Sequence, residues 1–452
     1  MKSAFLILVL EIMGSSASPN DLTSKNVLRP LAFHNAGQQS RRNLIDTAAQ
    51  TITAGVLTTS LSIPSPAVAK ALDKTNDLYS VYQIFPDASA NLSPYIKPIQ
   101  AAKFLQYNIF NGQNQGQEKQ NNNGLKGGVI WLGEHHNAKR DHDLQAIFIE
   151  NIYNQRKAMS RLGKDTPKLS IGLEQIQVQY QQVLDDYVQG KITEEEMLSG
   201  CEWKTRWSWP FENYRSVFVL AKKLKIPLIA LNVNSEDLVK VEDDGFKGLD
   251  RKIIRKYIKD PLGFAEFVKP LSYRTYSAYV IEPSYNMHKE MGILKTKTVA
   301  GELLDDKTSF RNFFSGRILW DEAMAGNAYE WTKDNECGVM IGLIGADHVK
   351  FEKGVVGRYQ RLLNQNKGDS ATKSIADAMN VSVLLNPTLI DTRPSGSTAA
   401  YMNASSSAFP DQITLQLRYL KDGVVPSSPD QSLPSSTGGV LPLADYIVIS
   451  NA

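Results

Sequence analysis

Cysteine, net charge and long hydrophobic runs are all scarce in this sequence, and each scarcity argues against a class of protein. Cys201 and Cys337 are the only two cysteines among 452 residues. They are too few for a disulfide framework or for a zinc site built from thiolates, although a single bridge between them stays open. With 50 basic and 47 acidic side chains the formal charge is only +3, so the overall charge predicts no nucleic-acid partner.

Two further absences narrow the chemistry and the location. No serine lies in a Gly-x-Ser-x-Gly elbow and neither cysteine has a catalytic neighbourhood, which argues against a serine or cysteine nucleophile. After residue 69 no apolar run reaches the length of a transmembrane helix, so we expect no membrane-spanning segment in the mature chain. The composition, 42% hydrophobic, is that of a protein with one large or two ordinary globular domains.

Residues 1–69 have the character of a targeting region rather than of folded structure. The first residues form an apolar run followed by small residues, as in a secretory signal peptide, although Glu11 is unusual in such a run. The pair Arg41-Arg42, a mildly apolar stretch and an Ala-x-Ala site at 67–69 then follow the layout of a twin-arginine signal. This order resembles the address of a protein of the thylakoid lumen in the plastid of an alga with a secondary plastid. The alternative is a secreted protein in which the arginine pair is accidental, and in either case we expect the mature chain to comprise residues 70–452.

The most informative feature of the chain is a pair of similar segments that end in histidine. The apolar run Val129–Leu132 leads into Gly133-Glu134-His135-His136, and the run Val339–Ile344 leads into Gly345-Ala346-Asp347-His348. Each run has the length of a buried strand, so each segment places an imidazole just beyond the carboxyl end of a strand. A single histidine in such a place is usually a structural residue, but two copies of one arrangement favour a functional site.

Two more short apolar runs place polar side chains at equivalent points. The run from Leu169 ends in Glu174, and the run from Ile226 ends in Asn232. If the four runs are parallel strands of one sheet, their carboxyl ends share an edge, where open α/β sheets bind ligands. We therefore expect an α/β fold with a central, mostly parallel sheet flanked by helices, and a crevice lined by Glu134, His136, Glu174, Asn232 and His348.

Two carboxylates and two imidazoles at one edge suit either of two chemistries. They can bind a divalent metal ion, or they can perform general acid/base catalysis. We accordingly predict Glu134, His136, Glu174 and His348 as catalytic residues and as metal ligands. The alternative is that Glu174 and Asn232 only cap the helices that follow them.

Other segments complete the expected fold. We expect helices after His142, over 175–189 and 312–331, a short capped helix after Thr193, and a helical excursion or lid over 239–307. Strands are expected at 381–385, 413–417 and 444–449, and flexible loops at 111–128, 394–407 and 426–439. A strand and then a helix are expected within 78–110.

Two details of these segments leave alternatives open. Trp203, Trp207 and Trp209 lie close together, and such a cluster is more often core than the lining of a flat cofactor. Arg317 and Asp321 lie four positions apart on the predicted helix, which is the spacing of a surface ion pair worth only a few tenths of a kcal/mol.

Taken together, the motifs resemble a known family. Similar segments in the same order occur in the ChaN-like haem-binding proteins, which belong with the TraB, Tiki and erythromycin-esterase group. The resemblance covers roughly residues 75 to 450, and the segments that carry it are Leu132–Asn137, Gly172–Glu174, Trp209–Arg215, Pro227–Asn232, Arg311–Phe314, Leu319–Ala325 and Gly345–His348.

The resemblance has specific implications. It implies an α/β fold and iron in the form of haem, or of a related tetrapyrrole, bound at the interface of a homodimer. The family pattern Gly-Glu-x-His selects His136 rather than His135, and it leads us to assign Arg215, Asn232 and Asp321 to cofactor binding. No tyrosine of this chain matches a haem-ligating tyrosine of the family, so the iron ligand stays open.

Relatives within the group imply a second function. Tiki-type members imply metal-dependent peptide hydrolysis, and erythromycin esterases imply hydrolysis by the Glu and His of the same motif. The two main hypotheses are therefore a haem- or tetrapyrrole-binding protein and a metal-dependent hydrolase that is peptidase-like or esterase-like. A third is a structural partner protein that keeps the fold without activity.

Overall fold

The computed structural model describes a set of segments that includes every residue of the predicted crevice. The predicted targeting region 1–69 lies outside the described residues, as does nearly all of the loop expected at 111–128 and of the helix expected before it. The described residues are 78–87, 94–100, 104, 127–161, 163, 166–290, 295–297, 303–365, 378–388, 404–406, 413–420 and 437–451.

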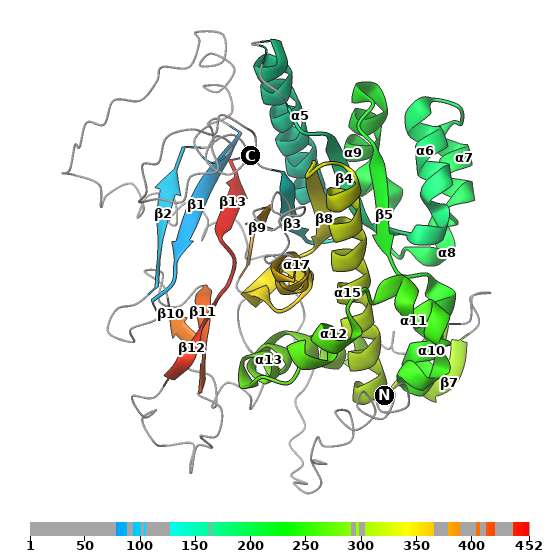
Figure 1. The fold of residues 1–452 in the computed structure, drawn as a ribbon, viewed down its shortest axis with the longest axis vertical. Coiled ribbons are helices and arrows are strands. Elements are labelled where there is room, and N and C mark those ends of the chain that lie inside the picture. The colour runs from blue at the N-terminus through cyan, green and yellow to red at the C-terminus, as the bar shows by residue number, and fades with distance from the viewer. Residues whose placement is uncertain are drawn as a thin grey trace, which may run out of the picture.

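An eight-stranded sheet forms the centre of the molecule (Figure 1). Six neighbouring strands are parallel and two at one edge are antiparallel, which confirms the predicted α/β class. The strands in spatial order are β2 (Tyr95–Ile99), β1 (Tyr79–Phe85), β13 (Tyr446–Ser450), β9 (Met379–Leu385), β3 (Gly128–Glu134), β8 (Val339–Gly345), β4 (Leu169–Gln177) and β5 (Leu228–Asn232).

The central strands are buried on both faces, and helices supply the two covering layers. Ile130 and Leu132 of β3 pack into one core, while Val129 and Trp131 pack into the other. This alternation is expected for a parallel sheet between two helical layers. The first core also contains side chains of α5 (Lys139–Arg161), α6 (Gln181–Gln189), α7 (Glu194–Gly200), α8 (Trp203–Arg206) and α9 (Phe211–Leu224). The second contains side chains of α10 (Ser235–Asp244), α11 (Arg251–Tyr257), α12 (Pro261–Phe267), α13 (Leu271–Tyr276), α15 (Phe310–Asp334) and α17 (Val355–Asn364).

The excursion predicted before α15 is helical for most of its length. After α13 the chain makes a π-helical turn, Ser277–Ile281, and continues as α14 (Glu282–Glu290). Pro283 lies two residues after this turn and lacks the N–H that a regular helix would use, so the wider turn suits that position. Strands β6 (Lys295–Lys297) and β7 (Leu303–Lys307) then pair as a hairpin, and the Ser309 side chain caps α15.

Three details differ from the sequence-based expectations. Residues 175–177 belong to β4 instead of to a helix, because β4 bulges where it leaves its neighbour and buries all of its residues. Strand β11 (Thr414–Leu420) lies outside the main sheet and pairs with β10 (Ala404–Ser406) and β12 (Thr437–Pro442). The stretches expected as loops at 394–407 and 426–439 therefore contain strand residues near their ends. Among the described helices, none combines the length and apolar character that a membrane span requires.

Candidate functional site

The crevice residues come together because four of the strands are neighbours. Strands β3, β8, β4 and β5 lie side by side and parallel, so their carboxyl ends share one edge. Glu134 is the last residue of β3, Asn232 is the last residue of β5, and Glu174 lies where β4 separates from β8. His348 lies on α16 (Ala346–Val349), the single turn that follows β8.

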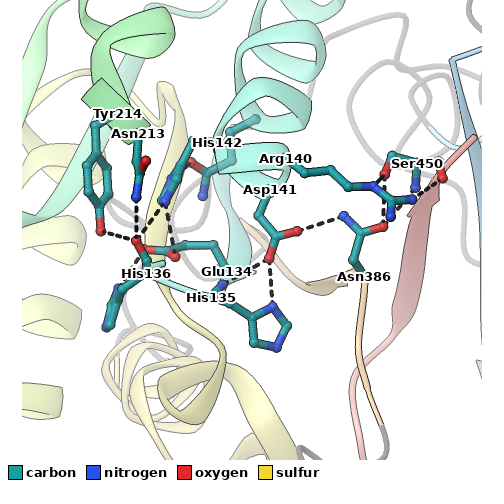
Figure 2. A network of polar contacts seen from close by, with 11 residues as sticks. Glu134, His135, His136, Arg140, Asp141, His142, Asn213, Tyr214, Asn386 and Ser450 are labelled. Carbon is teal, nitrogen blue, oxygen red and sulfur yellow. Dashed lines mark hydrogen bonds and ion pairs between the residues drawn. The ribbon is translucent and has the colours of Figure 1, made fainter. Parts of the chain in front are cut away.

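The first half of the site is a buried carboxylate between two imidazoles. Figure 2 shows Glu134 with His136 on one side and His142 on the other. Glu134 Oε1 is 2.7 Å from His136 Nδ1, and Glu134 Oε2 is 3.6 Å from His142 Nε2. The backbone carbonyl of His136 accepts hydrogen bonds from Tyr214 and Asn213. These contacts fix the turn after β3 and leave Nε2 of His136 without a hydrogen bond to any described residue.

Two tryptophans flank the His136 ring. Trp207 lies edge-on to it with ring centroids 5.0 Å apart, and Trp209 lies at 5.9 Å. The His136 side chain is 26% exposed, whereas Trp207 is buried. The tryptophan cluster is therefore mostly core, as its composition suggested, but it also forms one wall beside the accessible imidazole.

The surroundings of His136 favour its protonated form. Burial lowers the pKa of His136, but Glu134, Glu174 and Asp347 raise it more strongly, to about 9. At neutral pH the His136 imidazolium is therefore a donor and an acid. It acts as a proton acceptor only at alkaline pH.

The second half of the site is an imidazole held between two carboxylates. His348 Nε2 is 3.0 Å from Glu174 Oε1, and His348 Nδ1 bonds to Asp321 of α15. Arg317, one helical turn before Asp321, has its Nε 3.5 Å from the same carboxylate. The sequence spacing predicted an exposed pair, and this is wrong: Asp321 is fully buried and Arg317 is only 10% exposed, because α15 packs against the sheet at this point.

The ionisation of these groups is strongly coupled. Burial raises the pKa of Glu174, but His348, His136 and the Gly345 N–H lower it to about 2. Burial and Arg317 lower the pKa of His348, while Glu174 and Asp321 raise it above its usual value. Burial raises the pKa of Asp321, but Arg317 and His348 lower it. The second half is thus an ionised pair of carboxylates around an imidazole that favours its charged form.

Gly345 lies between the two halves of the site, next to both His136 and Glu174. Its N–H donates to Glu174 Oε2 at 2.5 Å. A Cβ at this position would lie 2.9 Å from His136 Cε1, 3.0 Å from His136 Nε2 and 3.5 Å from Glu174 Oε2. The His136 ring tip and the Glu174 carboxylate therefore approach each other across a position where only glycine fits. The glycines of the two Gly-x-x-His segments were visible in the sequence, but this role was not.

The other predicted residues differ in their placement. Asn232 lies at the edge, and its side chain donates to the Glu174 carbonyl at 2.7 Å. Arg215 lies on the outer face of α9, where it pairs with Glu194 and Glu212, and no contact joins it to the crevice among the described residues. His135 points the opposite way from His136 in Figure 2 and lies 2.7 Å from Asp141.

In this arrangement three of the four ring nitrogens of His136 and His348 already contact carboxylates. His348 contacts a carboxylate with each nitrogen, and His136 keeps only Nε2. Among the described residues no group of three or more histidine, cysteine, aspartate or glutamate side chains is placed to hold a metal ion. A metal ion bound here would require His348 to exchange at least one carboxylate partner for it.

The fold and the site define a class: an α/β protein with histidine–carboxylate pairs at the carboxyl edge of a parallel sheet. The chain belongs to the family described as haem-binding uptake, Tiki superfamily, ChaN, which it matches over residues 124–358, just over half its length. No curated protein matches it.

Three solved structures are similar to this chain, each at 12% identity. One is a ChaN of Campylobacter jejuni with cofacial haem (TM-score 0.41, covering 83% of this chain and 98% of that one). The second is an erythromycin esterase variant in its open conformation (TM-score 0.34, 78% and 94%). The third is a succinoglycan biosynthesis protein (TM-score 0.31, 86% and 97%).

Proposed function

We propose that this protein binds haem or a related tetrapyrrole, and that it does so outside the crevice. Family membership supports the ligand. The crevice does not suit a porphyrin, because the accessible nitrogen of His136 lies against the backbone at Gly345. The porphyrin ring lies across the bond between the iron and its protein ligand and needs a wide, flat space there, so an outer apolar surface is the better place for the ring.

Haemin titration tests this proposal directly. The purified full-length chain is titrated with haemin while the Soret band is followed, and the metal content of the same sample is measured. We expect saturable binding with a shifted Soret band. Titration that never saturates, or a spectrum identical to that of free haemin, would refute haem binding.

We also propose a second function, hydrolysis in the crevice, because of one observation. His136 combines an anchored Nδ1, an accessible Nε2 and a neighbouring carboxylate, Glu174. In its charged form the imidazolium can donate a proton or stabilise developing negative charge on a carbonyl oxygen. In its neutral form the same nitrogen can accept a proton from water. If a divalent metal ion is bound, it would supply an activated water in the same place, and Glu134, His136, Glu174 and His348 are its candidate ligands.

A double variant separates the two functions. His136→Ala with His348→Ala removes both imidazoles, so hydrolysis of ester or peptide substrates should fall by a factor of about 100 or more. Haem bound outside the crevice should be retained, provided that circular dichroism and thermal melting show an intact fold. Loss of haemin binding in a folded double variant would mean that the crevice histidines hold the iron.

We further propose that the protein is delivered to the thylakoid lumen and acts there on the tetrapyrroles of the plastid, and that it does so as a homodimer. The layered signals in residues 1–69 support the location.

Sedimentation analysis with and without haemin tests the proposed homodimer. A monomer under both conditions would exclude an interface built around the ligand.

A further inference from the structure

Aromatic rings gather where helix α14 meets the start of helix α15, at a place that the crevice does not use. The Tyr285 ring centroid lies 5.4 Å from that of Phe310 and 5.4 Å from that of Phe313. The His288 ring lies 5.6 Å from Phe313, and Phe314 lies 6.2 Å from Phe310. We call these five residues the α14 aromatic cluster.

Part of this cluster faces solvent. Phe310 is 38% exposed, and Met287, beside His288 on α14, is 47% exposed. Tyr285, Phe313 and His288 are partly exposed, in contrast to the phenylalanines of the two cores. One exposed ring bordered by partly exposed rings is a feature that a binding surface for a flat apolar ligand can use.

His288 has the geometry of an imidazole prepared to bind a metal ion. Its Nδ1–H donates to the backbone carbonyl of Ser284 at 2.7 Å, and because the acceptor is a carbonyl oxygen, the proton must be on Nδ1. The ring therefore turns Nε2 away from the helix backbone, and this nitrogen has no hydrogen bond to any described residue. An Nδ1–H bonded to a backbone carbonyl is the usual support of a histidine that ligates through Nε2.

The other histidines of the described chain are less suitable. His142 and His348 are buried, and His135 is paired with Asp141. His136 is accessible but faces Gly345 at close range. His288 thus combines partial exposure, an available Nε2 and adjacent aromatic rings.

Two cations lie beside the cluster in the sequence, and one exposed carboxylate, Glu290, ends the same helix. Lys289 and Arg311 are exposed and lie next to His288 and Phe310 in the chain. Neither forms a salt bridge with another residue in the part of the chain that the structure describes. Haem carries two propionates on one edge, and cations at the rim of an apolar surface are the natural partners of such groups.

We propose that His288 is the axial ligand of haem bound on the α14 aromatic cluster, with Phe310 and Phe313 against the ring and with Lys289 and Arg311 toward the propionates. This inference rests on the proposed function, because it names the iron ligand of that same activity. Tyr285 is the nearest competing ligand. Its hydroxyl already donates to the Thr308 carbonyl at 3.1 Å, which leaves it less free than His288.

The test compares His288→Ala with Asn286→Ala, an exposed position on the same helix, in the full-length chain. Haemin titration and electron paramagnetic resonance of the ferric complex are the measurements. We expect His288→Ala to weaken haemin binding about tenfold or more and to change the ferric spectrum, and Asn286→Ala to do neither. Unchanged affinity and spectrum in a folded His288→Ala variant would overturn the inference, and so would a spectral change in Tyr285→Phe with none in His288→Ala.

A second comparison tests the surface separately from the ligand. Phe310→Ala should weaken haemin binding without changing the ferric spectrum, whereas Tyr95→Ala should leave both unchanged, because Tyr95 is 50% exposed at the far edge of the main sheet. Equal effects of the two substitutions would overturn the assignment of the surface. If the unaltered protein does not bind haemin at all, the proposed function itself has failed, and the two failures are thus distinguishable.

Discussion

At the scale of single residues, the histidines show how environment decides the role of one side chain. His136 and His348 both contact buried carboxylates, yet His136 keeps one accessible nitrogen while His348 has none. His288 contacts a backbone carbonyl and no carboxylate. The same side chain is therefore an acid beside Glu134, favours its charged form between Glu174 and Asp321, and keeps an unbonded Nε2 on α14.

The contact between Glu134 and His136 predicts a specific pH dependence. Glu134→Gln removes the charge that contributes most to raising the pKa of His136, so this pKa should fall from about 9 toward its ordinary value of 6.5. Because the folded pKa lies above the unfolded one, the contact stabilises the protein fully below about pH 6.5, and this stability is lost as pH rises through about 9. NMR titration of the His136 ring and urea unfolding at several pH values provide the measurements. A variant whose His136 still titrates near 9 would contradict this assignment, and Glu174→Gln should have a smaller effect.

The buried position of Asp321 predicts a large effect on stability. Asp321→Asn leaves His348 and Arg317 in the interior without their shared anion, so the free energy of unfolding should fall by about 3–5 kcal/mol. Glu194→Gln is the matched control, because it breaks the exposed pair with Arg215 and should change the same quantity by less than about 1 kcal/mol. Urea denaturation measures both. Similar values for the two variants would show that Asp321 does not hold a buried ion network.

At the scale of elements, the two Gly-x-x-His segments have similar sequences but different local structures. After β3 the chain turns, and His136 bends back onto Glu134 of the strand end. After β8 the chain enters a helical turn, and His348 reaches Glu174 of the neighbouring strand. The two imidazoles therefore contact different carboxylates, Glu134 on the same strand end and Glu174 on the neighbouring strand.

Gly345 is the point at which this arrangement is most sensitive. In Gly345→Ala the new methyl group would lie 2.9 Å from His136 Cε1, so the ring must move away from Glu174. We expect a loss of about 1–3 kcal/mol in the free energy of unfolding and a lower pKa of His136, because its distance from Glu174 increases. NMR of the His136 ring and thermal melting measure the two effects. An unshifted His136 resonance would mean that the two halves of the crevice are not in contact.

At the scale of the whole molecule, the two proposed sites lie on separate parts of the fold. The crevice lies at the carboxyl edge of the sheet, and the α14 aromatic cluster lies on the helical excursion before α15 and on the first turn of α15. Helix α15 contributes to both, with its first turn in the cluster and with Arg317 and Asp321 in the crevice. The two proposals thus place tetrapyrrole binding and acid/base chemistry at different sites.

The predicted targeting region, residues 1–69, gives a further testable prediction. Replacing both Arg41 and Arg42 with lysine should block delivery of a reporter fused after Lys70 to the thylakoid lumen, because the twin-arginine export machinery requires that pair. Fractionation of plastids expressing the two fusions provides the measurement. Unchanged delivery would exclude a twin-arginine signal and favour secretion or simple import.

The sequence by itself determined the four neighbouring parallel strands that carry the crevice residues. The apolar runs before Glu134, Glu174, Asn232 and His348 are short, continuous and bounded by polar or glycine residues, and such runs predict buried parallel strands whose ends share an edge. Local pattern was sufficient here because a strand that is buried on both faces must be apolar at every position, and such a continuous apolar run can be recognised in the sequence.

Only the tertiary structure decided which side chains meet. Asp321 and His348 are 27 positions apart, and the helical spacing of Arg317 and Asp321 reads equally well as an exposed pair. The packing of α15 on the sheet buries that pair and makes it part of the site, because burial depends on what another element covers and not on the helix's own pattern. For the same reason neither the close approach at Gly345 nor the cluster around His288 could be derived from the sequence.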